Sequence, residues 1–220
     1  MMFGLDQKIA ALGSGEAFLV VAVLAVLLGL RHATDPDHLT AVTTLVAGDH
    51  PDPRRARRLG FLWGAGHATS LVLFGVPIVL YKAYLPHALQ TGAEFAVGLV
   101  IAALAIRLLV RRMRHDHRPT RSPAGAYGIG LVHGMGGSAG VGVLLLAGLP
   151  DHVEALVALV LFAAFTAVSM ALASTTFGYA LSRDAVVRRV APMAVALGCL
   201  SLAFGVWYSL GALNAVPYVF

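Results

Sequence analysis

The sequence predicts an all-α polytopic membrane protein with six transmembrane helices. Of its 220 residues, 58% are hydrophobic and only 12% are charged, and the mean hydropathy is +0.80. Soluble domains carry about twice that share of charged residues. Long apolar runs such as residues 18–30 and 156–165 lack the period-two alternation of a membrane β-barrel. Helices are therefore the expected way of crossing the bilayer.

Six apolar stretches are each long enough to cross a hydrocarbon core of about 30 Å as a helix. They cover, in order, about residues 16–47, 59–81, 91–110, 126–149, 153–181 and 190–213. The polar segments between them are short. We therefore expect residues 1–220 to form a single transmembrane domain, with halves at about 1–113 and 124–220 joined by a basic cytoplasmic loop.

A short internal similarity links the two halves. Gly29-Leu30-Arg31-His32 in the first stretch matches Gly130-Leu131-Val132-His133 in the fourth at three of four positions. With three helices in each half, the second half would be inverted relative to the first, as in many transporters. The sequence thus indicates a possible inverted 3+3 repeat, although a match this short also arises by chance.

The basic residues predict the orientation in the membrane. Arg residues gather in three of the polar segments, at about 48–58, 111–123 and 182–189, which a six-helix topology places on one side. Because positively charged loops stay in the cytoplasm, both termini are expected outside the cell (inner) membrane. The net charge of +5 comes from these same cytoplasmic arginines, so it is explained by the orientation in the membrane. We therefore expect the lipid bilayer as a partner and do not expect nucleic acid.

The first apolar stretch is interrupted by charged and polar residues between Arg31 and His38. Each charged residue at the centre of a membrane helix costs about 3 kcal/mol on insertion scales. Arg31, Asp35 and Asp37 must therefore face the bundle interior, pair with one another or line a wet cavity. A solvated loop between two short helices is the alternative.

Helical geometry and Pro36 refine this expectation. At 100° per residue, His32, Asp35 and His38 fall on one face of a helix, whereas Asp37 points elsewhere. Pro36 removes a backbone hydrogen bond and crowds the preceding turn. We therefore expect helix one to be broken near Pro36, which would let Asp37 turn inward.

Two later stretches each carry a histidine among glycines. His67 follows Gly64-Ala65-Gly66, and His133 precedes Gly134-Met135-Gly136-Gly137. Glycines allow membrane helices to approach closely, so each histidine alone is also compatible with a packed interior residue. Together with the first stretch they provide a set of candidate metal ligands: His32, Asp35, Asp37, His38, His67 and His133.

Imidazole and carboxylate ligands suit Ni²⁺, Co²⁺, Zn²⁺ and Mn²⁺, whereas copper(I) prefers sulfur. Cys199 is the single cysteine, so transport of a soft metal is disfavoured. We predict a transporter of a divalent transition-metal ion, which is its substrate, with no organic cofactor and no enzymatic activity. The alternatives are an intramembrane metal-dependent hydrolase and a haem-binding membrane cytochrome.

These residues resemble a known family. His32-Ala33-Thr34-Asp35-Pro36-Asp37-His38 is similar to the His-X4-Asp-His signature of the nickel/cobalt transporter family. Gly64-Ala65-Gly66-His67-Ala68-Thr69 and Gly130-Leu131-Val132-His133-Gly134 resemble two further motifs, the second found in the shorter, six-helix, urease-accessory-like members. The resemblance implies secondary transport of Ni²⁺ or Co²⁺, with His32, Asp37 and His38 handling the ion.

The chain also departs from the long members of that family. Those members have eight helices and an acidic Phe-Asp-Thr motif in a later helix. The fifth apolar stretch here reads Phe165-Thr166-Ala167-Val168-Ser169, without the acid. The identity of the metal, the coupling ion, the direction of transport and the oligomeric state stay open at this point.

Overall fold

A computed structural model describes residues 3–47, 53–81, 86–114, 122–136, 149, 151–181, 183 and 194–217, and this part of the chain is helical with no strand. Its helices are α1 (Phe3–His32), α2 (Pro36–Ala47), α3 (Pro53–Tyr81), α4 (His87–Arg114), α5 (Pro123–His133), α7 (His152–Leu181) and α9 (Ala194–Ala212). The all-α prediction is confirmed for these residues.

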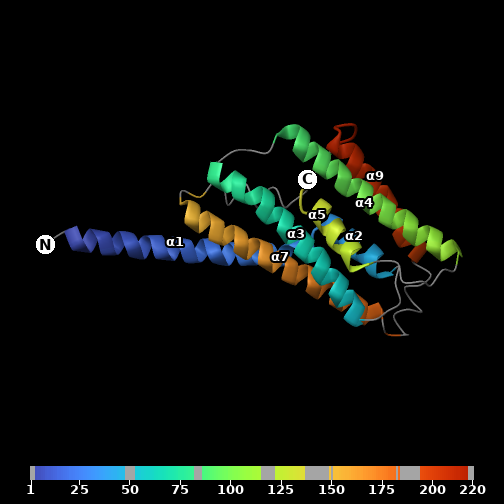
Figure 1. Cartoon of the computed structure of the whole chain (residues 1–220), viewed down its shortest axis with the longest axis horizontal. Coiled ribbons are helices and arrows are strands. Elements are labelled where there is room, and N and C mark those ends of the chain that lie inside the picture. The colour runs from blue at the N-terminus through green and yellow to red at the C-terminus, as the bar shows by residue number, and fades with distance from the viewer. Residues whose placement is uncertain are drawn as a thin grey trace.

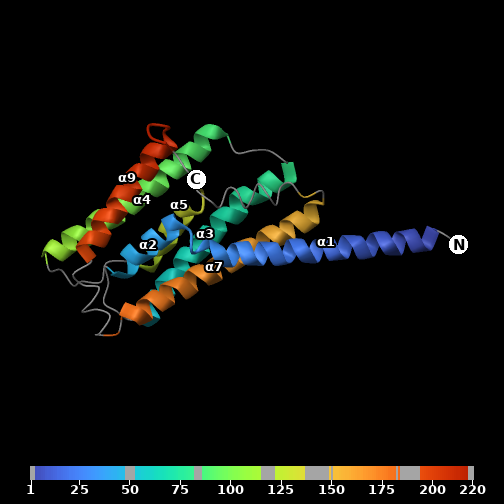
Figure 2. The ribbon, with the colours of Figure 1, turned by 180° about the vertical axis from the view of Figure 1, so that it is seen from behind.

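The helices form two groups that meet at α2 and α5 (Figure 1). In one group α7 packs against α1 and α3, and α3 also packs against α5. In the other, α4 lies along α9, as the opposite view also shows (Figure 2). The short helices α2 and α5 both contact α4, so they lie between the groups. Helices of the first half of the sequence therefore pack mainly on helices of the second half.

Apolar side chains both fill the interior and cover the outside of the helices. Leu71, Leu159 and Phe162 are buried where α3 meets α7. Large apolar residues on the outer faces are exposed, among them Leu73 at 63% and Leu200 at 69%. Such faces would be costly in water and are expected where a helix contacts lipid.

Among the residues that the structure describes, four helices are long and apolar enough to cross a membrane, namely α3, α4, α7 and α9. A fifth candidate combines residues 18–32 of α1 with residues 36–42 of α2, which are bent by 46° at their junction. The chain is thus a multi-pass membrane protein. The fourth predicted span, at about 126–149, falls largely on residues outside the described part, and α5 alone, with 11 residues, is too short to cross.

Helix one is broken near Pro36, as predicted. The α1 helix ends at His32, and the backbone N–H groups of Thr34 and Asp35 donate to the carbonyls of Arg31 and His32, which makes a tight turn. Pro36 then begins α2, where its missing N–H costs nothing because the first turn of a helix has no internal acceptor for it. The break separates His32 from His38 while keeping both in the interior.

Several helix ends differ from the hydropathy boundaries. The α1 helix begins at Phe3 rather than near residue 16, α3 begins at Pro53 and includes Arg54–Arg58, and α4 runs from His87 to Arg114. Segments that we expected to be loops are therefore partly helical. Hydropathy marks where lipid contact begins, whereas Pro53 is favoured at a helix start and arginine is a good helix former.

Candidate metal centre

Backbone contact between α3 and α5 brings two predicted ligands together. A methyl group on Gly66 would overlap the carbonyl oxygen of Tyr127, and one on Gly130 would overlap that of Trp63. Only glycine therefore allows the two backbones to touch at both positions. The contact holds His67, one residue after Gly66, close to His133, three residues after Gly130.

A third helix is held against this region by α7. Gly29 of α1 lies against the backbone carbonyl of Phe162, and the hydroxyl of Ser169 donates to the carbonyl of Gly29. These contacts fix the last turn of α1, which ends at His32. The hydroxyl of Thr166 donates within its own helix, to the carbonyl of Phe162.

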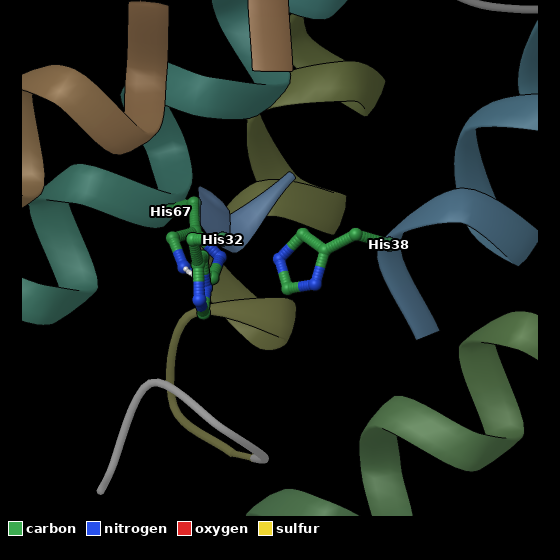
Figure 3. A group of neighbouring side chains, drawn as sticks. All are labelled: His32, His38 and His67. Atoms are coloured by element: carbon green, nitrogen blue, oxygen red, sulfur yellow. Dashed lines mark hydrogen bonds between the residues drawn. The ribbon is translucent and has the colours of Figure 1, made fainter. Parts of the chain in front are cut away.

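His32, His38 and His67 form a first group, here called the histidine triad (Figure 3). One ring nitrogen from each lies within 4.8 Å of the others. His32 Nε2 is 2.9 Å from His67 Nε2, and the ring centroid of His38 lies 4.4 Å from that of His32 and 5.0 Å from that of His67. All three side chains are buried.

Asp37, His38 and His133 form a second group, here called the aspartate triad. Asp37 Oδ1 is 3.1 Å from His38 Nδ1, and its Oδ2 is 3.1 Å from His133 Nε2. Each imidazole can donate its N–H to the carboxylate. Asp37 is 5% exposed, so the break at Pro36 has turned it into the interior. His38 belongs to both triads.

Several ring nitrogens of the two triads have no hydrogen-bond partner among the described residues. They are His38 Nε2, His67 Nδ1 and His133 Nδ1, and all three are buried. A buried polar atom without a partner costs about 1–3 kcal/mol. A cation that takes the lone pair of an unprotonated ring nitrogen removes that penalty, so these atoms fit a metal-binding role.

Asp35 lies behind the histidine triad rather than within either triad. Its Oδ2 is 3.3 Å from His32 Nδ1, the ring nitrogen opposite the one that faces His67. Its Oδ1 is 3.6 Å from the guanidinium of Arg31, which is exposed to solvent. A carboxylate on the far nitrogen of a metal-binding histidine orients the ring and raises its basicity. Of the six predicted residues, the structure thus brings five into the triads and places Asp35 beside His32, outside both triads.

Trp63 is a neighbour of the triads to which sequence analysis gave no role. Its ring lies 5.7 Å from that of His38 and 5.6 Å from that of His133, measured between centroids, and its side chain is buried. The indole Nε1 has no hydrogen-bond partner in the described part of the chain. Only the spacing of Trp63 and His67, one helical turn apart, could have indicated this contact.

The comparisons with known proteins point to metal transport. Residues 18–126, close to half of the chain, match the model of the NicO family, described as "High-affinity nickel-transport protein". This range contains His32, Asp35, Asp37, His38 and His67 but ends before His133. The urease accessory protein UreH of Bacillus sp. (strain TB-90) is 28% identical over 207 residues, which cover 86% of this chain and 90% of that protein.

Shorter similarities connect the chain to named transporters. The high-affinity nickel transport protein of Cupriavidus necator is 36% identical over 46% of this chain and 28% of its own length. The cobalt transport protein NhlF of Rhodococcus rhodochrous is 32% identical over 40% of this chain and 25% of its own length. The chain thus spans about a quarter of these two proteins. No solved structure matches.

The apolar spans and these matches together define a multi-pass membrane transporter of a metal ion. Hydrolase and cytochrome functions are not favoured by any of the matches. Residues 18–126 match the NicO family of high-affinity nickel transporters, in agreement with the resemblance of the sequence motifs.

Proposed function

We propose that the protein carries Ni²⁺ or Co²⁺ across the cell (inner) membrane through the two triads. His32, Asp37, His38, His67 and His133 would bind the ion in turn, and Asp35 would orient His32. Relatives are named for nickel and for cobalt, which supports both ions as substrates.

The observation that carries this proposal is the convergence of buried donors from four helices. His32 comes from α1, Asp37 and His38 from α2, His67 from α3 and His133 from α5. Burying this many titratable groups at membrane depth costs free energy, and ionisable groups within membrane spans mark functional sites. Nitrogen and oxygen ligands suit Ni²⁺ and Co²⁺, and Cys199 lies exposed on α9, outside both triads.

His32 Nε2 and His67 Nε2 lie 2.9 Å apart, the distance of a hydrogen bond between the two rings. A cation that binds both nitrogens would replace this hydrogen bond.

The proposed topology has six spans, both termini outside and the basic helix ends in the cytoplasm. Arginines at the start of α3 and at the end of α4 support this orientation. An inverted repeat is supported by α1 and α5, because each ends at a triad histidine and each has a glycine three residues earlier. Those glycines, Gly29 and Gly130, both lie against the backbone of a neighbouring helix.

Metal uptake into proteoliposomes tests the proposed function. Wild-type protein should accumulate radioactive ⁶³Ni²⁺ or ⁵⁷Co²⁺, and His38→Ala should abolish accumulation because both triads lose a ligand. His152→Ala is the matched control, since His152 is an exposed histidine at the start of α7. Normal uptake by a correctly folded His38→Ala protein would refute the site.

A further inference from the structure

Glu94 is a buried carboxylate of α4 that belongs to neither triad. Its side chain is 9% exposed, and it lies in the half of α4 remote from the arginines at the other end of the helix. Among the described residues, its one hydrogen bond is to Gln90, whose Nε2 lies 3.2 Å from Glu94 Oε1, and no cationic side chain forms an ion pair with it. An acidic group inside a membrane span is by default a candidate for a functional role.

Glu94 ends a polar stripe that descends from the surface. His87, Gln90, Thr91 and Glu94 are spaced by three, four and seven positions, so they share one face of α4. His87 and Gln90 are exposed, Thr91 is half-buried and Glu94 is buried. His87 Nδ1 and Thr91 Oγ1 lie 3.4 Å apart. The stripe therefore offers nitrogen and oxygen atoms at successive depths.

The inner end of the stripe lies beside the chain that carries a triad ligand. A methyl group on Gly136 would come within 3.1 Å of the Cα of Glu94, so the backbones of α4 and of the turn after α5 are in contact there. Gly136 is three residues beyond His133. The carbonyl end of α5 carries partial negative charge, which also favours a cation in this region.

We propose that Glu94, with Gln90 and Thr91, forms a docking site that receives the divalent cation before it reaches the aspartate triad. This inference rests on the proposed function. Oxygen ligands bind a hydrated divalent cation without stripping all of its water, and the Gln90 amide can present its oxygen as well as its nitrogen. Imidazole suits Ni²⁺ and Co²⁺ better than carboxylate and amide oxygens do, so the ion would pass inward to His133 and His38.

Uptake kinetics of Glu94→Gln test the docking site. This variant keeps the shape of the side chain and removes its charge, so we expect KM for Ni²⁺ to rise about tenfold while kcat changes by less than about twofold. Equilibrium binding of Ni²⁺ to the triads should stay at the wild-type level. Glu154→Gln is the matched control, since Glu154 is a half-buried carboxylate in the first turn of α7, and its KM should not change.

Three kinetic results would overturn the docking site. The first is an unchanged KM in Glu94→Gln, and the second is a loss of kcat at constant KM, which would assign the carboxylate to a later step such as proton transfer. The third result concerns a fallback variant, Glu94→Asp, which is used if Glu94→Gln fails to fold. Its shorter carboxylate should raise KM by a smaller factor than Glu94→Gln would. A KM equal to that of the wild type in Glu94→Asp would then overturn the docking site.

A binding measurement separates this inference from the proposed function. In His38→Ala, where the triads are disabled, we expect a residual weak Co²⁺ site that His38→Ala/Glu94→Gln lacks. If the wild type transports neither ion, the proposed function fails, and this pair of variants still tests the docking site. Equal Co²⁺ binding by the two variants would refute it.

Discussion

Asp37 Oδ2 lies 3.1 Å from His133 Nε2, although the two residues are 96 positions apart in the chain. The other oxygen of the same carboxylate lies 3.1 Å from His38 Nδ1. One aspartate therefore connects the break in the first span to the end of α5. This connection makes Asp37 the group whose charge should matter most to a bound cation.

Replacing Asp37 should weaken metal binding more than replacing Asp35. We expect Asp37→Asn to lower Ni²⁺ affinity by more than about 100-fold, because an anionic ligand is lost, and Asp35→Asn to lower it by about 10-fold, because only the support of His32 is lost. Isothermal titration calorimetry in detergent measures both. A larger effect for Asp35→Asn would reverse the assigned roles.

Removal of a histidine that belongs to one triad should leave the other triad able to bind. We expect His67→Ala and His133→Ala each to keep a weakened Co²⁺ site with an altered visible absorption spectrum, because His38 remains in both proteins. His38→Ala should lose the spectrum of the triads altogether. Identical spectra for wild type and His67→Ala would show that the histidine triad does not bind the ion.

The contact between α3 and α5 should make Gly130 irreplaceable. Gly130→Ala places a methyl group on the carbonyl oxygen of Trp63, so the helices must separate, and we expect a loss of several kcal/mol of stability. Gly128→Ala on the same helix is the control, since a methyl group there meets no atom within 4 Å and alanine favours a helix by up to about 1 kcal/mol. Thermal unfolding in detergent compares them, and equal melting temperatures would contradict the close packing.

Metal binding should weaken as the solution becomes more acidic. A histidine must be unprotonated to bind a metal, and histidines normally titrate between about pH 5 and 8. We therefore expect Ni²⁺ affinity to fall as the pH is lowered from 7.5 to 4.0, since protons compete for the same ring nitrogens. Equilibrium titration in detergent excludes effects of a proton gradient, and an affinity that stays constant over this range would argue against imidazole ligands.

The broken helix and the candidate ligands could be predicted because the relevant physics is local. Pro36 cannot continue a helix in its interior, and the charges around it are too costly to face lipid. The structure shows the break at this position and brings His32, Asp37 and His38 together with His67 and His133. The expectation that Asp37 turns inward when the helix unwinds also matches the structure.

Contacts between distant helices could not be read from the sequence. Nothing local shows that the two oxygens of Asp37 meet different histidines, or that Trp63 packs on His38. Glu94 also escaped notice, although an acid within an apolar stretch was a usable signal. The helix starts at Phe3 and Pro53 were missed because hydropathy reports on lipid contact rather than on backbone hydrogen bonds.

The place of His38 in both triads limits occupancy under the proposed function. A cation in the histidine triad takes up the imidazole that the aspartate triad requires, and the reverse also holds, so simultaneous filling by two ions leaves one of them short of a ligand. The protein should then transport one ion at a time, and its transport rate should saturate as the ion concentration rises. Channel-like conduction, in which an entering ion displaces a bound one, would need a second histidine in place of the shared one.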